Sequence, residues 1–406
     1  MKNLSSQTIA KLRKRRGAIP AVPGSLSLQP DGLLSPQARA DVQRCVEEIF
    51  RRNRTVGGTM GLVVQGRLAG VFPYGLARVQ EQVPVTEDTY FRVASVSKLV
   101  FAFAALRLVE DGLLELDADI GTYLGYRVCN PRYPDVPITL RQLLTHTASL
   151  LDNALYDGPG IDEEMTMRQL LTPPNDAVDF SHDEPGTVFC YSNFGAGIAG
   201  SMMEIVTGER FDDLMQRLVF HPLGIRASFA PQRISPVDGL ACGYYVSRVF
   251  PPRVAYDAPA LAARPLPPVD PEMDFTWSPG RLIIRAGDMA KLLRLLLSDG
   301  SVDGVRVLRP ASIELMRTCQ DGLGSVRHAG RGLNVAVLEG LCGKGRIIGH
   351  QGVAYGMNAE LWGDVERNSG LVMQTSGTML HKYDGFIRCG FEMTAFAFDL
   401  IDHLLQ

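Results

Sequence analysis

The sequence predicts an α/β protein in which an antiparallel sheet is flanked by helices and interrupted by a mainly helical insertion. Strand and helix patterns occupy both ends of the 406-residue chain, whereas helical patterns alternate with Pro- and Gly-rich loops in the middle. A single hydrophobic core seldom grows beyond roughly 250–300 residues, so this length suggests one large domain or two medium ones. We expect an α/β domain over residues 35–112 and 270–406, with an insertion over residues 113–269.

The N-terminal residues 1–34 are expected to form a basic tail followed by an extended arm. The tail carries a cluster of basic residues from Lys11 to Arg16 and contains no apolar run long enough for a signal peptide. No stretch of the chain reaches the roughly 20 apolar residues of a transmembrane helix. Seven scattered cysteines without Cys-x-x-Cys spacing fit free thiols in a reducing compartment. Together these features predict a cytoplasmic protein.

Charge and metal-ligand spacing exclude two classes of function. The formal net charge is −3, so the chain lacks the excess of positive charge that is typical of nucleic-acid-binding proteins. The histidines outside the motifs described below show no metal-ligand spacing, so neither a metal site nor another cofactor is expected. The sequence gives no indication of the oligomeric state.

The first elements of the α/β domain are a helix and a hairpin. Ser35 provides an N-cap and Pro36 occupies the first helical position, and apolar residues then recur at helical spacing until about Asn53. Two glycines turn the chain into an expected strand over residues 60–65. Residues 68–74 follow as its hairpin partner.

The same patterns locate the later elements. They predict helices over residues 139–146, 165–171, 193–206, 287–297 and 392–405. They predict strands over residues 333–338, 346–348 and 370–374, the last of them antiparallel to a strand around Leu361.

The run from Phe91 to Leu106 is the helix with the most unusual pattern. It is apolar on almost every side, which is typical of a helix buried within a domain. Its first turn nevertheless carries two hydroxyls and Lys98, and Ser95 precedes Lys98 by three residues. In a helix this spacing places both side chains on one face, one turn apart. A buried helix whose polar groups gather at its N-terminus is expected to present them to a cleft.

Three short motifs follow one another along the chain: Ser95-x-x-Lys98, Tyr191-x-Asn193 and His350-x-Gly352. A second His-x-Gly begins at His328, but the strand pattern before His350 and the Tyr355-Gly356 pair after it favour the later motif. Each motif alone is weak. The three in this order are difficult to obtain by chance.

The residue types suit acyl transfer through a serine nucleophile. A serine hydroxyl is a poor nucleophile until a neighbouring base removes its proton. Burial at a helix N-terminus disfavours the charged form of a lysine, so Lys98 is a candidate base for Ser95. Tyr191 is expected to relay the proton to the leaving group. Asn193 is expected either to hold Lys98 or to donate to a substrate carbonyl.

The motifs and their flanks resemble those of the class C β-lactamase-like serine hydrolases, a family that includes β-lactamases, D,D-peptidases, D-aminopeptidases, esterases and transesterases. The resemblance extends over roughly residues 55 to 400. It rests on four segments: Asp88–Lys98, Ile138–Thr147, Pro185–Asn193 and Gly349–Gly352.

The resemblance implies a β-lactamase/transpeptidase-like fold and a role for each motif residue. Ser95 would be the nucleophile, and Lys98 and Tyr191 the acid/base pair. The backbone N–H of Val353 would join that of Ser95 in binding the oxyanion. The residues expected to contact substrate are Asn193, His350, Gln351, Gly352 and Val353.

Three positions depart from the family pattern. The family usually has Ser-Gly-Leu after Thr147, whereas this chain has Ala-Ser149-Leu. Gln351 replaces a hydroxyl residue that helps β-lactamases bind the substrate carboxylate, and Arg281 lies in a turn that is usually smaller and richer in hydroxyls. We therefore expect Ser149, Arg281 and Gln351 to select the substrate, and a β-lactam or peptide carboxylate is disfavoured.

The sequence predicts a serine hydrolase or acyltransferase that acts through a Ser95 acyl-enzyme, most simply on an ester or thioester of a small carboxylic or peptidyl acid. An amidase, a D-aminopeptidase or a peptide-cyclising transacylase would use the same chemistry. A non-catalytic binding protein or a structural subunit on the same fold is a further alternative, although retention of all four polar motif residues speaks against it.

Overall fold

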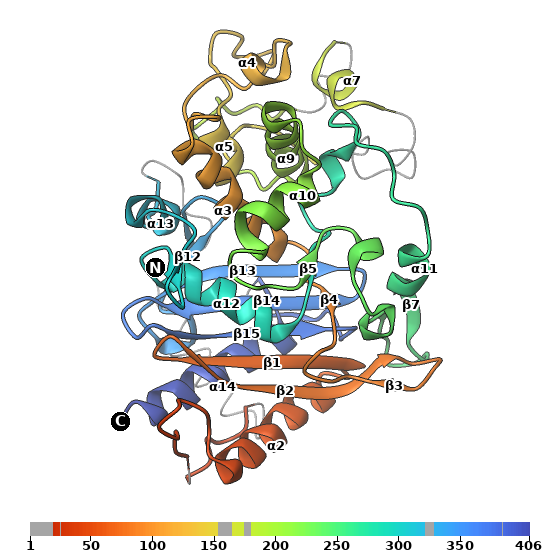
Figure 1. Ribbon diagram of the computed structural model, residues 1–406, viewed down its shortest axis with the longest axis vertical. Helices are drawn as coiled ribbons and strands as arrows, with labels where there is room; N and C mark the ends of the chain where they lie inside the picture. The colour runs from red at the N-terminus through yellow and green to blue at the C-terminus, as the bar shows by residue number, and fades with distance from the viewer. Residues whose placement is uncertain (1–18, 25, 153–164, 174–179, 321–328, 384) are drawn as a thin grey trace.

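The protein is built around one antiparallel sheet of eight strands (Figure 1). The computed structural model describes residues 19–24, 26–152, 165–173, 180–320, 329–383 and 385–406, so the expected basic tail and His328 lie outside the described residues. In spatial order the strands are β11 (Ala329–Arg331), β12 (Ala336–Glu339), β13 (Arg346–Ala354), β14 (Met357–Asp364), β15 (Ser369–Thr375), β1 (Gly57–Val64), β2 (Arg67–Arg78) and β3 (Val83–Pro84).

The expected hairpin is confirmed, and its two strands lie inside the sheet between β15 and the edge strand β3. β1 pairs with β2 around a tight turn at Gln65-Gly66, where both residues have positive φ values of 48° and 73°. Left-handed conformations of this kind suit the turn of a two-residue hairpin. On its other side β1 pairs with β15, so the first and last thirds of the chain share one sheet.

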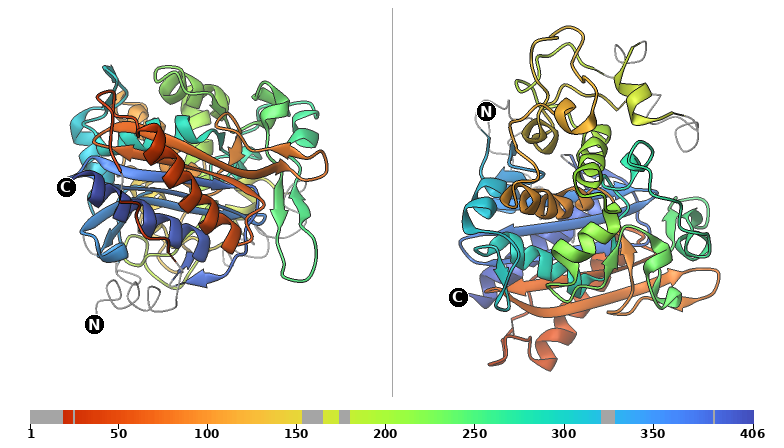
Figure 2. Two further views of the ribbon diagram at one scale, coloured as in Figure 1. Left: turned by 90° about the horizontal axis from the view of Figure 1, so that it is seen from below. Right: turned by 45° about the horizontal axis from the view of Figure 1, so that its top comes forward.

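Helices α2 (Pro36–Arg52) and α14 (Arg388–Leu404) cover one face of the sheet (Figures 1 and 2). Ser35 caps α2 as expected, and its Oγ accepts a hydrogen bond from the Ala38 N–H at 3.3 Å. Apolar side chains of both helices and of the sheet form one buried cluster. The opposite face is covered by α3 (Val96–Glu110) and α12 (Ala286–Leu297).

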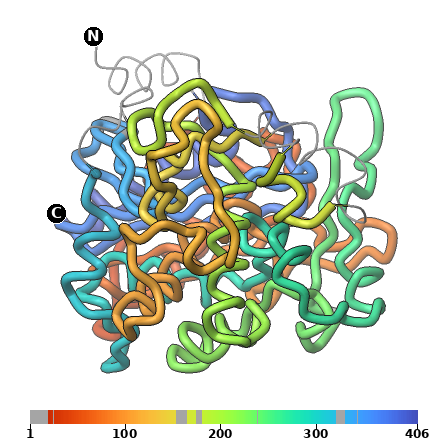
Figure 3. Tube along the Cα trace, turned by 90° about the horizontal axis from the view of Figure 1, so that it is seen from above, coloured from red at the N-terminus to blue at the C-terminus, as the bar shows by residue number. Residues whose placement is uncertain are grey.

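A region rich in short helices lies above α3, at the top of Figure 1, and overlies the sheet when seen from above in Figure 3. It contains α4 (Gly121–Leu124), α5 (Leu140–Thr145), α7 (Met167–Leu171), α9 (Asn193–Thr207) and α10 (Phe211–Met215). A single buried cluster joins apolar residues of α5, α9 and α10 to those of α3 and α12. The helical region therefore packs directly on the helix that carries Ser95.

Short strands tie the two regions together beside the start of α3. β4 (Phe91–Arg92) pairs with β8 (Ile283–Ile284), which also pairs with β5 (Ala227–Ser228). A hairpin of β6 (Gly243–Tyr245) and β7 (Arg253–Tyr256) follows, and then helix α11 (Ala258–Ala262). The expected fold class, an antiparallel sheet flanked by helices, is confirmed. Among the described helices, none has both the length and the apolar character needed to cross a membrane.

Candidate active site

Ser95 lies at the entry to α3, where the chain leaves β4 through a strained turn. Ala94 has a φ of 46°, a left-handed value that is uncommon for a residue with a side chain. The turn is held by Ser97, whose Oγ donates to the Ala94 carbonyl at 2.6 Å and accepts from the Leu282 N–H at 3.1 Å. The strain and these bonds fix the position of Ser95 at the N-terminus of an otherwise apolar helix.

Lys98 is fully buried one turn further along α3, and its Nζ lies within hydrogen-bond distance of three oxygen atoms. Nζ lies 3.2 Å from Ser95 Oγ, 2.7 Å from Asn193 Oδ1 and 2.7 Å from the Pro279 carbonyl oxygen. A neutral amine has two N–H groups and one lone pair. If the two N–H groups point at the two carbonyl oxygens, the lone pair points at the serine hydroxyl, which is the arrangement that a general base requires.

Asn193 is the first residue of α9, and its amide is held at both ends. Oδ1 accepts from Lys98, whereas Nδ2 donates to Asp152 Oδ2 at 2.7 Å. The same carboxylate accepts from the backbone N–H of Asn193 and from that of Phe194, at 2.8 and 3.0 Å. The sequence analysis did not identify Asp152, because a lone aspartate in a loop has no motif of its own.

Tyr191 lies beside Lys98, and its ring is stacked on a histidine. Lys98 Nζ is 5.0 Å from the centre of the Tyr191 ring, and the His146 ring is 4.4 Å away on an inclined plane. His146 Nδ1 accepts from the Ser192 N–H at 3.2 Å, which also ties the histidine to the Tyr191 segment. Burial and the nearby positive charge of Lys98 hold the pKa of His146 well below its usual value. His146, which received no role from sequence, is therefore a neutral support for Tyr191.

His350 faces the same group from β13. Its ring centre is 6.4 Å from that of Tyr191, and Nδ1 lies 2.6 Å from the Gln351 carbonyl oxygen. Burial is the main cause that lowers its pKa to about 3, and the positive charges of Lys98 and Arg331 act in the same direction. His350 is thus neutral at physiological pH.

Gly352 lets β13 closely approach the turn before α3, at residues 93–95. A Cβ added to Gly352 would overlap the Val93 carbonyl oxygen and lie 3.1 Å from the Ser95 nitrogen. Within the described residues β12 pairs with β13 only as far as Gly349, so the later residues of β13 have an open edge on that side. A strand with a side chain at position 352 does not fit against this turn.

The backbone N–H of Val353 points out of that open edge. On β14, the N–H and the carbonyl of Asn358 both bond to Thr375 Oγ1 on the far side, at 2.8 and 3.0 Å. Paired residues of antiparallel strands exchange both hydrogen bonds or neither. Asn358 is the partner of Val353 and is engaged on the β15 side, so Val353 directs its N–H away from β14, toward the cleft.

A cleft of about 830 Å³ opens beside Ser95. Its walls combine aromatic and apolar side chains with polar and charged ones. The aromatic and apolar residues include Phe229, Tyr245, Tyr256, Leu261, Trp277 and Tyr355, and the charged residues are Arg92, Asp257, Arg264 and Arg281. The Arg92 guanidinium contacts two of these rings, 4.9 Å from the centre of Tyr256 and 4.7 Å from that of Tyr355. Arg281 also lines the cleft and donates to Thr276 Oγ1 at 2.7 Å.

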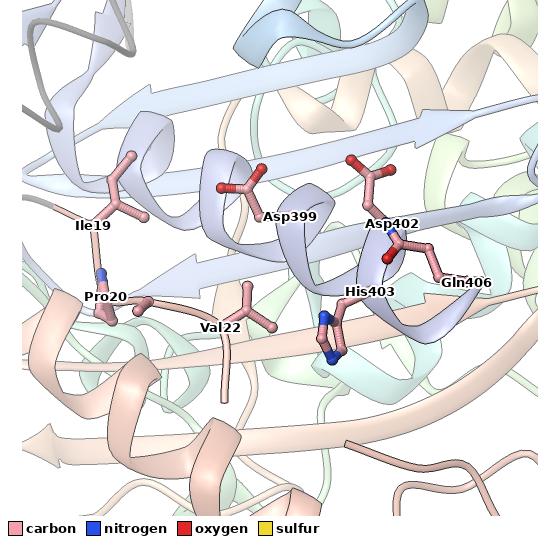
Figure 4. A pocket seen from close by; sticks show the side chains of 8 residues that line it. Ile19, Pro20, Val22, Asp399, Asp402, His403 and Gln406 are labelled. Carbon is pink, nitrogen blue, oxygen red and sulfur yellow. The ribbon is translucent and has the colours of Figure 1, made fainter. Parts of the chain in front are cut away.

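A second hollow lies far from this site, between the N-terminal arm and the end of α14 (Figure 4). In the figure, Ile19, Pro20 and Val22 of the arm run beside the end of α14, which carries Asp399, Asp402 and His403. Lys344 forms ion pairs with both carboxylates. The charges of this hollow are thus engaged within the chain.

The sequence profile of the Beta-lactamase family matches residues 42–385, which is most of the chain. The chain belongs to this family. Penicillin-binding protein 4 of Amycolatopsis lactamdurans is 30% identical over 292 residues, which cover 70% of this chain and 70% of that protein. Esterase EstB of Burkholderia gladioli is 32% identical over 211 residues, 47% of this chain and 52% of the esterase, so the match spans about half of its length.

Among solved structures, the octameric penicillin-binding protein homologue from Pyrococcus abyssi superimposes with a TM-score of 0.71 at 20% identity, over 88% of this chain and 76% of the homologue. This likeness confirms the β-lactamase-like fold expected from the motifs. Membership of the Beta-lactamase family, together with esterase relatives, supports a serine hydrolase.

Three residues that depart from the Beta-lactamase family pattern were expected to select the substrate, and two of them, Gln351 and Ser149, do not lie where this role requires. Gln351 does not reach the cleft, because its Nε2 donates at 2.8 Å to Glu360, on the face of the sheet that packs against α14. Burial raises the pKa of this carboxyl to about 7. Ser149 is buried and accepts from Asn130 Nδ2 at 3.1 Å. We therefore withdraw the expectation that these two side chains select substrate, whereas Arg281 lies in the cleft as expected.

Proposed function

We propose that the protein is an esterase that works through an acyl-enzyme on Ser95. One observation carries this proposal: Lys98 Nζ lies 3.2 Å from Ser95 Oγ while its two shortest hydrogen bonds go to fixed carbonyl oxygens. That geometry supports proton transfer from the serine to the lysine as Oγ attacks the carbonyl carbon of an ester. The new bond joins Ser95 Oγ to the acyl carbon.

Tyr191 is proposed to carry the proton onward. When the tetrahedral intermediate collapses, the bond between the acyl carbon and the leaving oxygen breaks, and that oxygen requires a proton. The proton first taken by Lys98 passes to the leaving alcohol through the Tyr191 hydroxyl. The short distance from Lys98 Nζ to the Tyr191 ring, and the stacking of that ring on neutral His146, support this route.

The oxyanion of the intermediate is proposed to bind two backbone N–H groups. One belongs to Ser95, at the positive end of the α3 dipole, and the other to Val353, on the open edge of β13. Water then attacks the acyl-enzyme, breaks the bond to Oγ and releases the acid. An acceptor alcohol or amine in place of water would give acyl transfer, and analysis of the products distinguishes the two outcomes.

The proposed substrate is an ester or thioester of a small carboxylic or peptidyl acid that carries an apolar or aromatic group. The aromatic side chains in the wall of the cleft, among them Tyr256, Trp277 and Tyr355, support binding of such a group. Gln351 is engaged with Glu360, and this chain has no hydroxyl residue at that position to bind a substrate carboxylate. Similarity to esterase EstB agrees with an ester substrate.

A fluorophosphonate probe followed by intact-mass measurement tests the proposal. We expect one label per chain on the wild-type protein and no label on Ser95→Ala. Short p-nitrophenyl esters should be hydrolysed and nitrocefin should not. An unlabelled wild-type protein that also fails to hydrolyse the esters would refute the enzyme proposal, and efficient nitrocefin hydrolysis would refute the proposed substrate class.

A further inference from the structure

We infer that Asp152 is a positioning residue that sets the direction of the Asn193 amide and, through it, the direction of Lys98. The inference rests on the proposed function, because it concerns the base of the same reaction. Asp152 does not contact Ser95 in the structure. The inferred effect on Lys98 passes through Asn193.

Asp152 gathers four hydrogen bonds from one short segment at the start of α9. Ser192 Oγ and the Phe194 N–H donate to Oδ1, each at 3.0 Å. The backbone N–H and the side-chain Nδ2 of Asn193 both donate to Oδ2, at 2.8 and 2.7 Å. The carboxylate therefore holds both the backbone and the side chain of Asn193, at a helix N-terminus that favours a negative charge.

The chemistry of the carboxylate selects one of the two orientations of the amide. An ionised aspartate only accepts hydrogen bonds, so it binds the NH₂ end of Asn193 and repels the oxygen end. With Nδ2 held by Asp152, Oδ1 must face Lys98, where it accepts a hydrogen bond at 2.7 Å. The reversed amide would direct N–H groups at Lys98 Nζ and an oxygen at the carboxylate, and both contacts would be lost.

This orientation affects the reaction because Asn193 provides one of the three acceptors around Lys98. An amide that samples both orientations no longer fixes the Nζ hydrogens, so the lone pair is not held toward Ser95 Oγ. Misdirection of a catalytic group by about 1 Å is enough to lower a rate roughly 100-fold. Loss of Asp152 should therefore lower kcat and leave binding of substrate in the cleft almost unchanged.

The test compares Asp152→Asn with the wild-type protein in p-nitrophenyl ester hydrolysis. We expect kcat to fall about 100-fold with KM within about twofold. Asp152→Asn removes a negative charge from the group around Lys98, so the acid limb of the kcat/KM profile should move to lower pH. A role confined to folding would lower activity without moving that limb.

Two control variants separate positioning from stability. Ser192→Ala removes the α9 cap, whose Oγ accepts from the Gly195 N–H at 2.9 Å, and one of the four hydrogen bonds to Asp152, but it leaves both Asn193 bonds to Asp152. Asp183→Asn makes the same substitution at an exposed aspartate of the same region. Both variants should keep the wild-type pH profile and kcat within about threefold of wild type.

The outcomes distinguish this inference from the proposed function. If wild-type protein hydrolyses the esters and Asp152→Asn retains its kcat and pH profile, the positioning role is refuted and the esterase stands. If Ser192→Ala reproduces the loss of kcat and the shift of the acid limb, the role of Asp152 is only to cap α9, which also refutes the inference. Failure of wild-type protein to react with any ester or fluorophosphonate refutes the proposed function itself.

Discussion

Substitution of Gly352 by alanine tests whether β13 must lie against the nucleophile turn for catalysis. The added methyl group would overlap the Val93 carbonyl oxygen and press on the Ser95 nitrogen, 3.1 Å away. Both are backbone atoms, so the strand and the turn have to separate, by roughly 1 Å. A displacement of this size between Ser95 and the Val353 N–H should lower kcat/KM by about 100-fold or more. The cost in stability should stay within about 1–3 kcal/mol, the usual range for overpacking.

The assay measures p-nitrophenyl ester hydrolysis and the thermal midpoint of Gly352→Ala beside Gly345→Ala. Gly345 directly precedes β13, and a Cβ there would meet no atom within 4 Å, so the same substitution should be silent. Wild-type kcat/KM in a folded Gly352→Ala variant would show that the strand can move away without harm. The oxyanion site proposed on the β13 edge would then be wrong.

Two further predictions concern the cleft and the buried histidine. Arg281→Ala should enlarge the cleft beside Ser95. We expect kcat/KM for p-nitrophenyl octanoate, divided by kcat/KM for p-nitrophenyl acetate, to rise by about tenfold. The control variant Arg226→Ala should leave this ratio unchanged. His350 has a pKa of about 3 in the folded protein, whereas an ordinary histidine has one of 6.5. As the pH falls below 6.5, the unfolded chain therefore binds a proton at this residue and the folded protein does not. The free energy of unfolding should decrease by about 2 kcal/mol between pH 7 and pH 5 because of this residue. Urea unfolding at pH 7 and 5 should show that His350→Gln removes this loss and that His403→Gln, at an exposed position, does not.

Elements with local signals were predictable from the sequence. The cap at Ser35 and the spacing of Ser95 and Lys98 each depend on residues within one or two turns, and the structure contains the corresponding helices. The hairpin and the C-terminal helix were recognisable for the same reason, because periodicity and turn chemistry act over short stretches. The roles assigned to Tyr191 and Asn193 remain proposals, although the structure brings both residues to Lys98.

Features that depend on register or on distant segments were not predictable. Whether Gln351 faces the cleft or Glu360 depends on which face of β13 it occupies, and a shift of one residue reverses this. Asp152 meets Asn193 across 41 residues, and His146 meets the Ser192 N–H across 46. No local pattern reports contacts of this kind.

The three acceptors around Lys98 also determine when the catalytic centre can form during folding. Ser95 is three residues from Lys98, but Asn193 is 95 residues away and Pro279 is 181. Such distant contacts form only once the intervening chain has collapsed, so a partly folded chain with α3 already helical would still lack an oriented base. Recovery of ester hydrolysis during refolding should therefore follow the slowest tertiary step rather than helix formation. Enzyme activity thus reports completion of the native fold.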